Sequence, residues 1–123
     1  MIIVHENNAP AVNVPAPFKR TLKVLLSPAI NPEIESIGAG LTILPPGGKS
    51  NDAKHVEGEM FYVLCGKGCI RVGEEEEELT PGTAIWVPPG VTHQLLNNSN
   101  KTLKILWVLS PPGREAAILK KSV

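Results

Sequence analysis

The chain has 123 residues, of which 42% are hydrophobic and 20% charged, and its 12 Lys and Arg balance its 12 Asp and Glu. This composition excludes disordered, collagen-like and coiled-coil proteins, and the length fits one domain spanning residues 1–123. A net charge of zero provides no overall field that attracts nucleic acid or an anionic membrane surface, so we expect neither as a partner.

Short apolar runs separated by turn-forming residues dominate the chain, which holds 11 Gly and 12 Pro. In chain order, they predict strands at residues 18–27, 37–44, 60–64, 69–72, 78–80, 84–87, 93–96 and 103–109. Residues 114–121 are the one segment that favours a helix, of two turns at most. The pattern therefore predicts an all-β protein, a sandwich or a small barrel, with a short helical turn near the end.

The N-terminal residues and the cysteines favour a cytoplasmic protein with reduced thiols. Residues 1–4 are apolar, but His5 and Glu6 follow at once, so the run is far shorter than that of a signal peptide. No apolar run approaches the ~20 residues of a membrane span. The two cysteines, Cys65 and Cys69, are expected to be small buried hydrophobic residues without a catalytic role.

One carboxylate stands out in the predicted strand that contains residues 60–64. Residues two apart share a face of a strand, so Glu59 lies on the same face as Phe61 and Val63. Burying an ionised carboxylate among such neighbours costs several kcal/mol unless a cation or hydrogen-bond donors compensate it, as a rough scale. Glu59 is therefore expected to have a partner.

Two histidines can provide that partner. His55 lies four residues before Glu59 on the same parity, and His93 follows the rigid turn Pro88-Pro89-Gly90 on a face shared with Leu95. Two neutral imidazoles and a carboxylate form a sufficient ligand set for a divalent transition metal. The alternative is a buried polar network without a metal, in which Glu59 accepts hydrogen bonds from one or both imidazoles.

The spacing of these residues resembles the cupin superfamily. Its first motif, Gly-(X)5-His-X-His-(X)3,4-Glu-(X)6-Gly, is matched over residues 47–66 by Gly47, His55, Glu59 and Gly66. Its second motif, Gly-(X)5-Pro-X-Gly-(X)2-His-(X)3-Asn, is matched over residues 82–97 by Gly82, Pro88, Gly90, His93 and Asn97. The resemblance implies a double-stranded β-helix (jelly-roll) barrel that holds one metal ion, with His55, Glu59 and His93 as ligands.

The chain departs from the first motif at one position. Ala53 stands where the family usually has its first histidine, which leaves two histidines and one glutamate. This set resembles the 2-His-1-carboxylate triad of non-haem Fe(II) oxygenases, but it is also compatible with a weakened or metal-free site. Asn51, Asp52 and Glu57 are the candidates to replace the missing ligand.

The ligand types admit Fe, Mn, Co, Ni or Zn as the cofactor and leave three functions open. The first is a metal-dependent enzyme, such as a non-haem oxygenase, acting on a small organic substrate. The second is a non-catalytic cupin that binds or senses a small ligand, and the third is a sugar-modifying cupin. The side chains expected to line the pocket are Ala53, Phe61, Val63, Leu95 and Asn97.

Further residues are candidates for supporting roles. Tyr62 and Arg71 are possible general acid or base groups, and Gln94 is expected to face outward from a regular strand. Trp86 and Trp107 are expected in the core or at a subunit interface. Because a barrel this small leaves apolar strands incompletely covered, we expect a homodimer.

Overall fold

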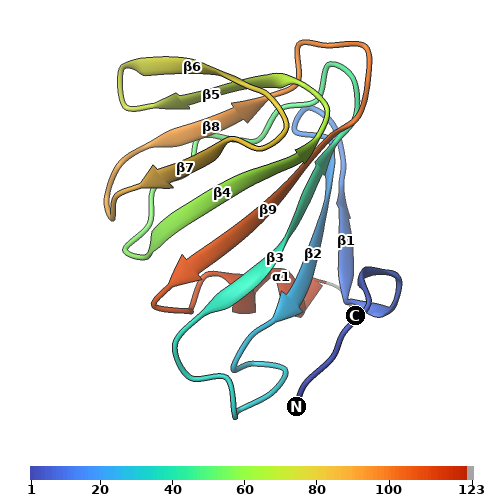
Figure 1. The fold of residues 1–123 in the computed structure, drawn as a ribbon, viewed down its shortest axis with the longest axis vertical. Helices are drawn as coiled ribbons and strands as arrows, with labels where there is room; N and C mark the ends of the chain where they lie inside the picture. The colour runs from blue at the N-terminus through green and yellow to red at the C-terminus, as the bar shows by residue number, and fades with distance from the viewer. Residues whose placement is uncertain (122–123) are drawn as a thin grey trace.

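The computed structural model describes residues 1–121, which form two antiparallel sheets facing each other (Figure 1). The strands are β1 (Ala11–Val14), β2 (Arg20–Leu26), β3 (Gly38–Leu44), β4 (Gly58–Cys65), β5 (Gly68–Val72), β6 (Glu75–Leu79), β7 (Ala84–Val87), β8 (His93–Leu96) and β9 (Leu103–Ser110). A short 3-10 helix, Glu6–Asn8, precedes β1, and α1 (Glu115–Lys121) follows β9. The predicted all-β class and the short C-terminal helix are both confirmed.

The larger sheet has the strand order β1-β2-β3-β9-β4-β7, and the smaller one has the order β6-β5-β8. Isolated bridges pair Lys49 with Leu96 and Ala53 with His93, so the segment between β3 and β4 extends the smaller sheet alongside β8. β1 was not expected from the sequence. Its four residues alternate between exposed and half-buried positions and pair with β2 from Ala11 to Val14, close to the prolines at positions 10 and 15.

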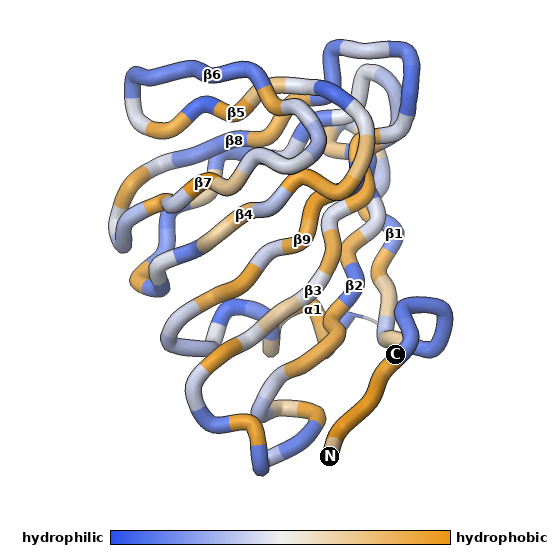
Figure 2. The backbone as a smooth tube through the Cα atoms, viewed as in Figure 1, coloured by the Kyte–Doolittle hydropathy of each residue, from blue (hydrophilic) through white to orange (hydrophobic). Residues whose placement is uncertain are grey.

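The core lies between the two sheets and is built from alternate residues of their strands. β9 shows the pattern most clearly: Leu103, Ile105, Trp107 and Leu109 are all at most 3% exposed, whereas the residues between them are half-buried. Figure 2 shows the same contrast along the chain, with apolar residues concentrated in β9 and hydrophilic residues in β6. Trp107 is in the core as expected, whereas Trp86 is 57% exposed on β7.

The helix α1 packs against β1 and β2 and is fixed by a buried carboxylate. Glu115, 1% exposed, accepts a 2.5 Å hydrogen bond from the Ser27 hydroxyl and a 2.6 Å bond from the Gly113 N–H. Gly38 of β3 leaves room for this carboxylate, because a Cβ atom at that position would lie 2.6 Å from it and Glu115 would have to shift. No helix within residues 1–121 is both long and apolar enough to cross a membrane.

Candidate metal centre and its cavity

Glu59 enters the site from the second position of β4. It pairs with Val87 of β7 on one side and with Leu109 of β9 on the other, so the strand interior fixes its backbone. Its side chain points toward the smaller sheet and the residue is 8% exposed. As the sequence indicated, a carboxylate stands among apolar neighbours and needs compensation for its burial.

Both predicted histidines are oriented by the backbone. His55 Nδ1 lies 2.9 Å from the carbonyl oxygen of Glu57, and His93 Nδ1 lies 3.0 Å from that of Val91. Because a carbonyl oxygen only accepts hydrogen bonds, we assign the proton of each ring to Nδ1. In the neutral imidazoles Nε2 then carries a lone pair, which is the state that binds a metal.

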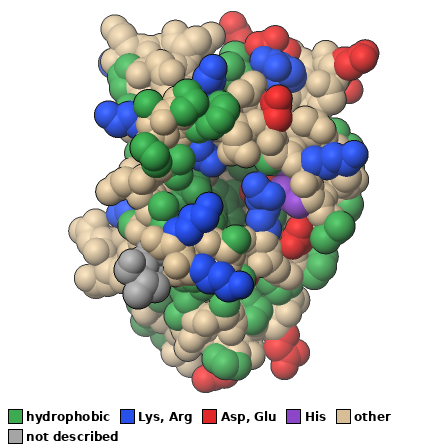
Figure 3. All heavy atoms as spheres, turned by 180° about the vertical axis from the view of Figure 1, so that it is seen from behind, with side chains coloured by type: hydrophobic (Ala, Val, Ile, Leu, Met, Phe, Trp, Pro, Cys, Tyr) green, Lys and Arg blue, Asp and Glu red, His purple; other side chains and the backbone are tan. Residues whose placement is uncertain are grey.

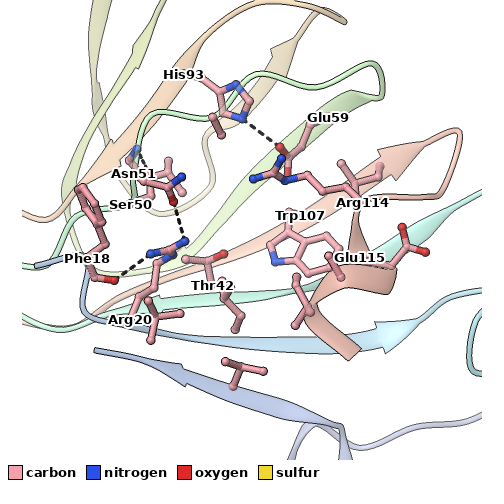
Figure 4. A pocket seen from close by; sticks show the side chains of 18 of the residues that line it. Phe18, Arg20, Thr42, Ser50, Asn51, Glu59, His93, Trp107, Arg114 and Glu115 are labelled. Atoms are coloured by element: carbon pink, nitrogen blue, oxygen red, sulfur yellow. Dashed lines mark hydrogen bonds and ion pairs between the residues drawn. The ribbon is translucent and has the colours of Figure 1, made fainter. Parts of the chain in front are cut away.

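The two Nε2 atoms converge on one oxygen of Glu59. His55 Nε2 lies 3.1 Å and His93 Nε2 3.2 Å from Glu59 Oε1, and the three ligand atoms are all within 4.8 Å of one another. Figure 4 shows the contact between His93 and Glu59. Two lone pairs directed at a carboxylate oxygen repel it, so this arrangement requires either a proton on an Nε2 atom or a cation among the three. The donor set therefore fits a divalent transition metal.

The ionisation of the cluster follows from the same contacts. Burial raises the pKa of Glu59, but hydrogen bonds and charge from His55 and His93 outweigh burial and lower it. The hydrogen bond to Glu59 raises the pKa of His55 against the opposing effect of burial. Without a metal, the cluster is thus held together by a proton shared between imidazole and carboxylate.

None of the candidates for an additional ligand joins the cluster. Glu57 Oε1 lies 3.6 Å from His55 Nδ1, on the side of the ring away from Glu59. The amide oxygen of Asn51 accepts a hydrogen bond from Arg20, and Asp52 is exposed. Within residues 1–121 the metal-ligating group therefore consists of two histidines and one glutamate.

Ala53 lies beside this group. Its N–H donates to the His93 carbonyl oxygen, and the His93 N–H donates to that of Ala53, both at 2.9 Å. Its methyl group lines a cavity that also contains Glu59 and His93. Where the first motif usually provides an imidazole, the chain thus offers open space next to the cluster.

This cavity has a volume of about 380 Å³, within the range of sites for small molecules. Of the five residues expected to line it, Ala53, Phe61 and Leu95 do so. The Phe61 ring centroid lies 5.9 Å from that of His93. His55 does not line the cavity, although its ring lies within the same cluster as Glu59 and His93.

The prediction that Val63 and Asn97 line the cavity is wrong. Val63 has the same parity as Glu59, but it lies deeper in the barrel and is completely buried in the core. Asn97 is a turn residue whose amide group donates to the carbonyl oxygens of Leu44, Pro45 and Lys101. Burial depth in one case and local turn chemistry in the other override strand parity.

Three other expectations about polar residues also change. Gln94 does not face outward: it is 9% exposed and donates a 2.7 Å hydrogen bond to the Ser50 carbonyl, which holds the segment before Ala53. Tyr62 and Arg71 are exposed and do not line the cavity, so neither can serve there as an acid or base. The expectation of two buried cysteines is confirmed for Cys69 and wrong for Cys65, which is exposed; both are free thiols.

Two arginines of the cavity were missed by the sequence analysis. Arg20 of β2 and Arg114, directly before α1, both line it. A signal for Arg20 was present, since it has the same parity as Leu22, which lines the cavity, and Val24, which is in the core. Arg114 follows a proline- and glycine-rich turn, where parity gives no information.

A barrel of two antiparallel sheets with a His, Glu and His cluster on its inner wall defines the class of protein. The family model described as the cupin domain matches residues 40–109, and the chain belongs to the cupin family. Both sequence motifs fall inside the matched segment.

Three other proteins are similar to the chain in sequence or in fold. A protein of Streptomyces coelicolor, itself uncharacterised, is 31% identical over 77 residues, which is 63% of this chain and 72% of the relative. A Thermotoga maritima structure described as a predicted oxalate decarboxylase aligns with a TM-score of 0.76 at 22% identity, over 90% of this chain and all of the other. The polyketide cyclase RemF of Streptomyces resistomycificus aligns with a TM-score of 0.77 at 23% identity, over 91% of this chain and 80% of its own. At these identities the two structures show the shared fold alone.

Proposed function

We propose that the chain is a metal-dependent cupin enzyme, of the non-haem oxygenase kind, that acts on a small organic substrate. The observation that carries the proposal is the orientation of the imidazoles: with both Nδ1 atoms bonded to carbonyl oxygens, His55 and His93 direct their Nε2 lone pairs at Glu59 Oε1. Three facial ligands leave further coordination positions for water or substrate.

The residues around this site have separable roles. His55, Glu59 and His93 would hold the ion, and the backbone carbonyls of Glu57 and Val91 keep the two rings in the ligating tautomer. A bound first-row ion supplies Lewis-acid polarisation and, where it is redox-active, electron transfer. The apolar walls of the cavity limit the access of water to the substrate.

The similar structures support an enzyme. One is described as a predicted oxalate decarboxylase and another is a polyketide cyclase, so this barrel accommodates chemistry on organic molecules in proteins of similar shape. Because fold similarity does not determine the reaction, the proposal depends on the site itself.

Elemental analysis of protein purified without chelator or metal-binding tag tests the metal site. We expect near-stoichiometric divalent metal in the wild-type chain and its loss in His93→Ala. His5→Ala is the matched control, because His5 is exposed beside the 3-10 helix and makes a local bond to the Asn7 N–H. Absence of metal from the wild-type chain, even after anaerobic reloading, would refute the proposal.

A second candidate function is a cupin that holds a ligand without turnover. It is favoured by the lining within residues 1–121: its acids are Glu59, engaged with the histidines, and Glu115, engaged with Ser27 and Gly113. No other imidazole or carboxylate of these residues is placed there to move a proton. Dioxygen uptake by the iron-loaded protein with catechols, diketones and thiols separates the two functions, since a ligand-binding cupin shows none.

A further inference from the structure

The cavity contains two guanidinium groups whose charges no acidic side chain neutralises. Arg20 projects from β2 and Arg114 from the turn before α1, and Figure 4 shows both groups directed into the same space. Within residues 1–121 neither forms an ion pair. Arg20 is half-buried and Arg114 is exposed, although both line the cavity. A half-buried arginine ordinarily pairs with a carboxylate or phosphate, and no such partner of Arg20 is present among these residues.

Arg20 is held in place by neutral groups. Its Nη1 donates a 2.8 Å hydrogen bond to the Phe18 carbonyl oxygen, and its Nη2 donates a 2.9 Å bond to Asn51 Oδ1. These acceptors fix the orientation of the guanidinium without cancelling its charge. A fixed donor group with an uncancelled charge is suited to binding an anion, because little conformational entropy is lost when the anion arrives.

Arg114 adds a second positive charge near the first. Burial, and then the charge of Arg114, lowers the pKa of Arg20, so the two guanidinium groups repel each other across the cavity. Arg114 lines the same cavity as Glu59 and His93, so its charge lies near the metal cluster as well as near Arg20.

The two acids of the lining offset only part of the charge of its three cations, Arg20, Arg114 and Lys121, and both acids are already engaged by other groups. Glu59 is shared by the two imidazoles, and Glu115 is bonded to Ser27 and Gly113. Lys121 adds a further cation to the lining, and a divalent metal would increase the excess of positive charge. Figure 3 shows the face onto which the cavity opens, with Lys and Arg side chains gathered around the hollow.

We propose that the cavity binds a small organic acid whose carboxylate is held by Arg20 and Arg114 while its other end faces the His55–Glu59–His93 cluster. This assignment of the substrate class rests on the proposed metal-dependent function. A carboxylate is favoured over a phosphate because Leu22, Trp107 and Ile118 give the cavity apolar walls that suit a short carbon chain. A volume of about 380 Å³ is sufficient for a few-carbon acid.

Calorimetric titration with malonate, succinate and glutarate tests the proposal, with butyrate and inorganic phosphate as the comparison anions. Each titration uses the 123-residue chain in both metal-free and metal-loaded form. We expect at least one dicarboxylate to bind more tightly than butyrate, and Arg114→Gln to weaken that binding by about tenfold or more. Arg20→Gln is expected to have the same effect, and Arg71→Gln, a change of an exposed arginine outside the cavity, to have none.

The outcomes separate this proposal from the proposed function. Metal content should be unchanged in Arg114→Gln, because Arg114 is not a ligand. Arginine-dependent binding of a dicarboxylate to a chain that takes up no metal would support the anion site and refute the metal enzyme. Binding that is equal in wild-type and Arg114→Gln protein, or the absence of dicarboxylate binding, would overturn the anion site. Tighter binding of phosphate than of any carboxylate would overturn the assignment to an organic acid.

Discussion

Metal binding should stabilise the fold by an amount that can be worked out in advance. A ligand that binds only the folded state at a free concentration one hundred times its Kd adds about 2.7 kcal/mol. With an unfolding entropy of about 2.1 cal/mol/K per residue, 123 residues give roughly 0.26 kcal/mol/K, so Tm should rise by about 10 °C. His93→Ala should abolish this rise, because it removes one of the three ligands.

Without a metal, the contribution of the histidine–glutamate cluster to stability depends on pH. The bond to Glu59 raises the pKa of His55 above its ordinary 6.5, so the contribution of this imidazole is complete below pH 6.5 and is lost as pH rises through its folded pKa. Despite burial, bonds from the two histidines lower the pKa of Glu59 below its ordinary 4.5, so its contribution is present above pH 4.5 and is lost as pH falls through its folded pKa. The metal-free cluster is therefore most stabilising between about pH 4.5 and 6.5.

A divalent ion reverses the trend on the alkaline side. It takes the place of the shared proton, so its affinity increases as the imidazoles deprotonate. At a fixed metal concentration, the difference in Tm between metal-loaded and metal-free protein should widen from pH 6 to pH 8. Differential scanning calorimetry measures both series. A difference in Tm that is constant across this range, or that persists in His93→Ala, would refute the assignment of His55, Glu59 and His93 as metal ligands.

Three further predictions concern assembly and packing. A second copy of the chain is expected to cover the exposed outer side of β4 and β7, where Trp86 lies. Light scattering should therefore give twice 13.2 kDa, and Trp86→Glu should halve that mass. A wild-type mass of 13.2 kDa would contradict this prediction. Ser27→Ala removes one hydrogen-bond donor from the buried Glu115 carboxylate and should lower the free energy of unfolding by about 1–3 kcal/mol. An unchanged midpoint of urea unfolding would show that this hydrogen bond does not contribute to stability. Gly40→Ala places a methyl group against both the Lys23 carbonyl oxygen of β2 and the ring of Trp107. It should lower the free energy of unfolding by about 1–3 kcal/mol and shift the tryptophan fluorescence, and wild-type values for both would contradict the tight packing.

The parts of the fold and site that could be predicted depend on local signals. Turn-forming residues follow each apolar run, as Asn97 and Asn98 follow the run at residues 93–96, so the predicted strand there has the observed bounds, His93–Leu96. Period-two alternation placed Glu59 and Phe61 on the inner face of β4, and the structure brings Glu59 together with both histidines. These features depend on the geometry of one strand and its adjoining turn, which a sequence specifies directly.

The features that the sequence did not predict depend on how deeply a residue is buried and on contacts between segments far apart in the sequence. Strand parity places Val63 on the inner face of β4, but it does not indicate that this residue is completely buried in the core and not in the cavity wall. Arg20 and Arg114 approach each other because α1 folds back against β1 and β2, a contact for which the sequence has no local signal. The four-residue β1 escaped notice because it is stabilised by its pairing with β2.

The loss of a ligand at position 53 and the presence of two arginines in the same cavity are physically complementary. An imidazole at that position would occupy both a coordination position and part of the space that the Ala53 methyl group leaves open. With fewer ligands from the protein, more of the coordination sphere is left to the substrate, and oxygen ligands of an organic acid are anionic. Such a substrate is attracted by an excess of positive charge, which Arg20 and Arg114 provide without an acidic partner among the described residues. If the cavity binds an organic acid as proposed, Ala53 and the arginine pair would serve one function, because open coordination space and positive charge both favour an anionic ligand.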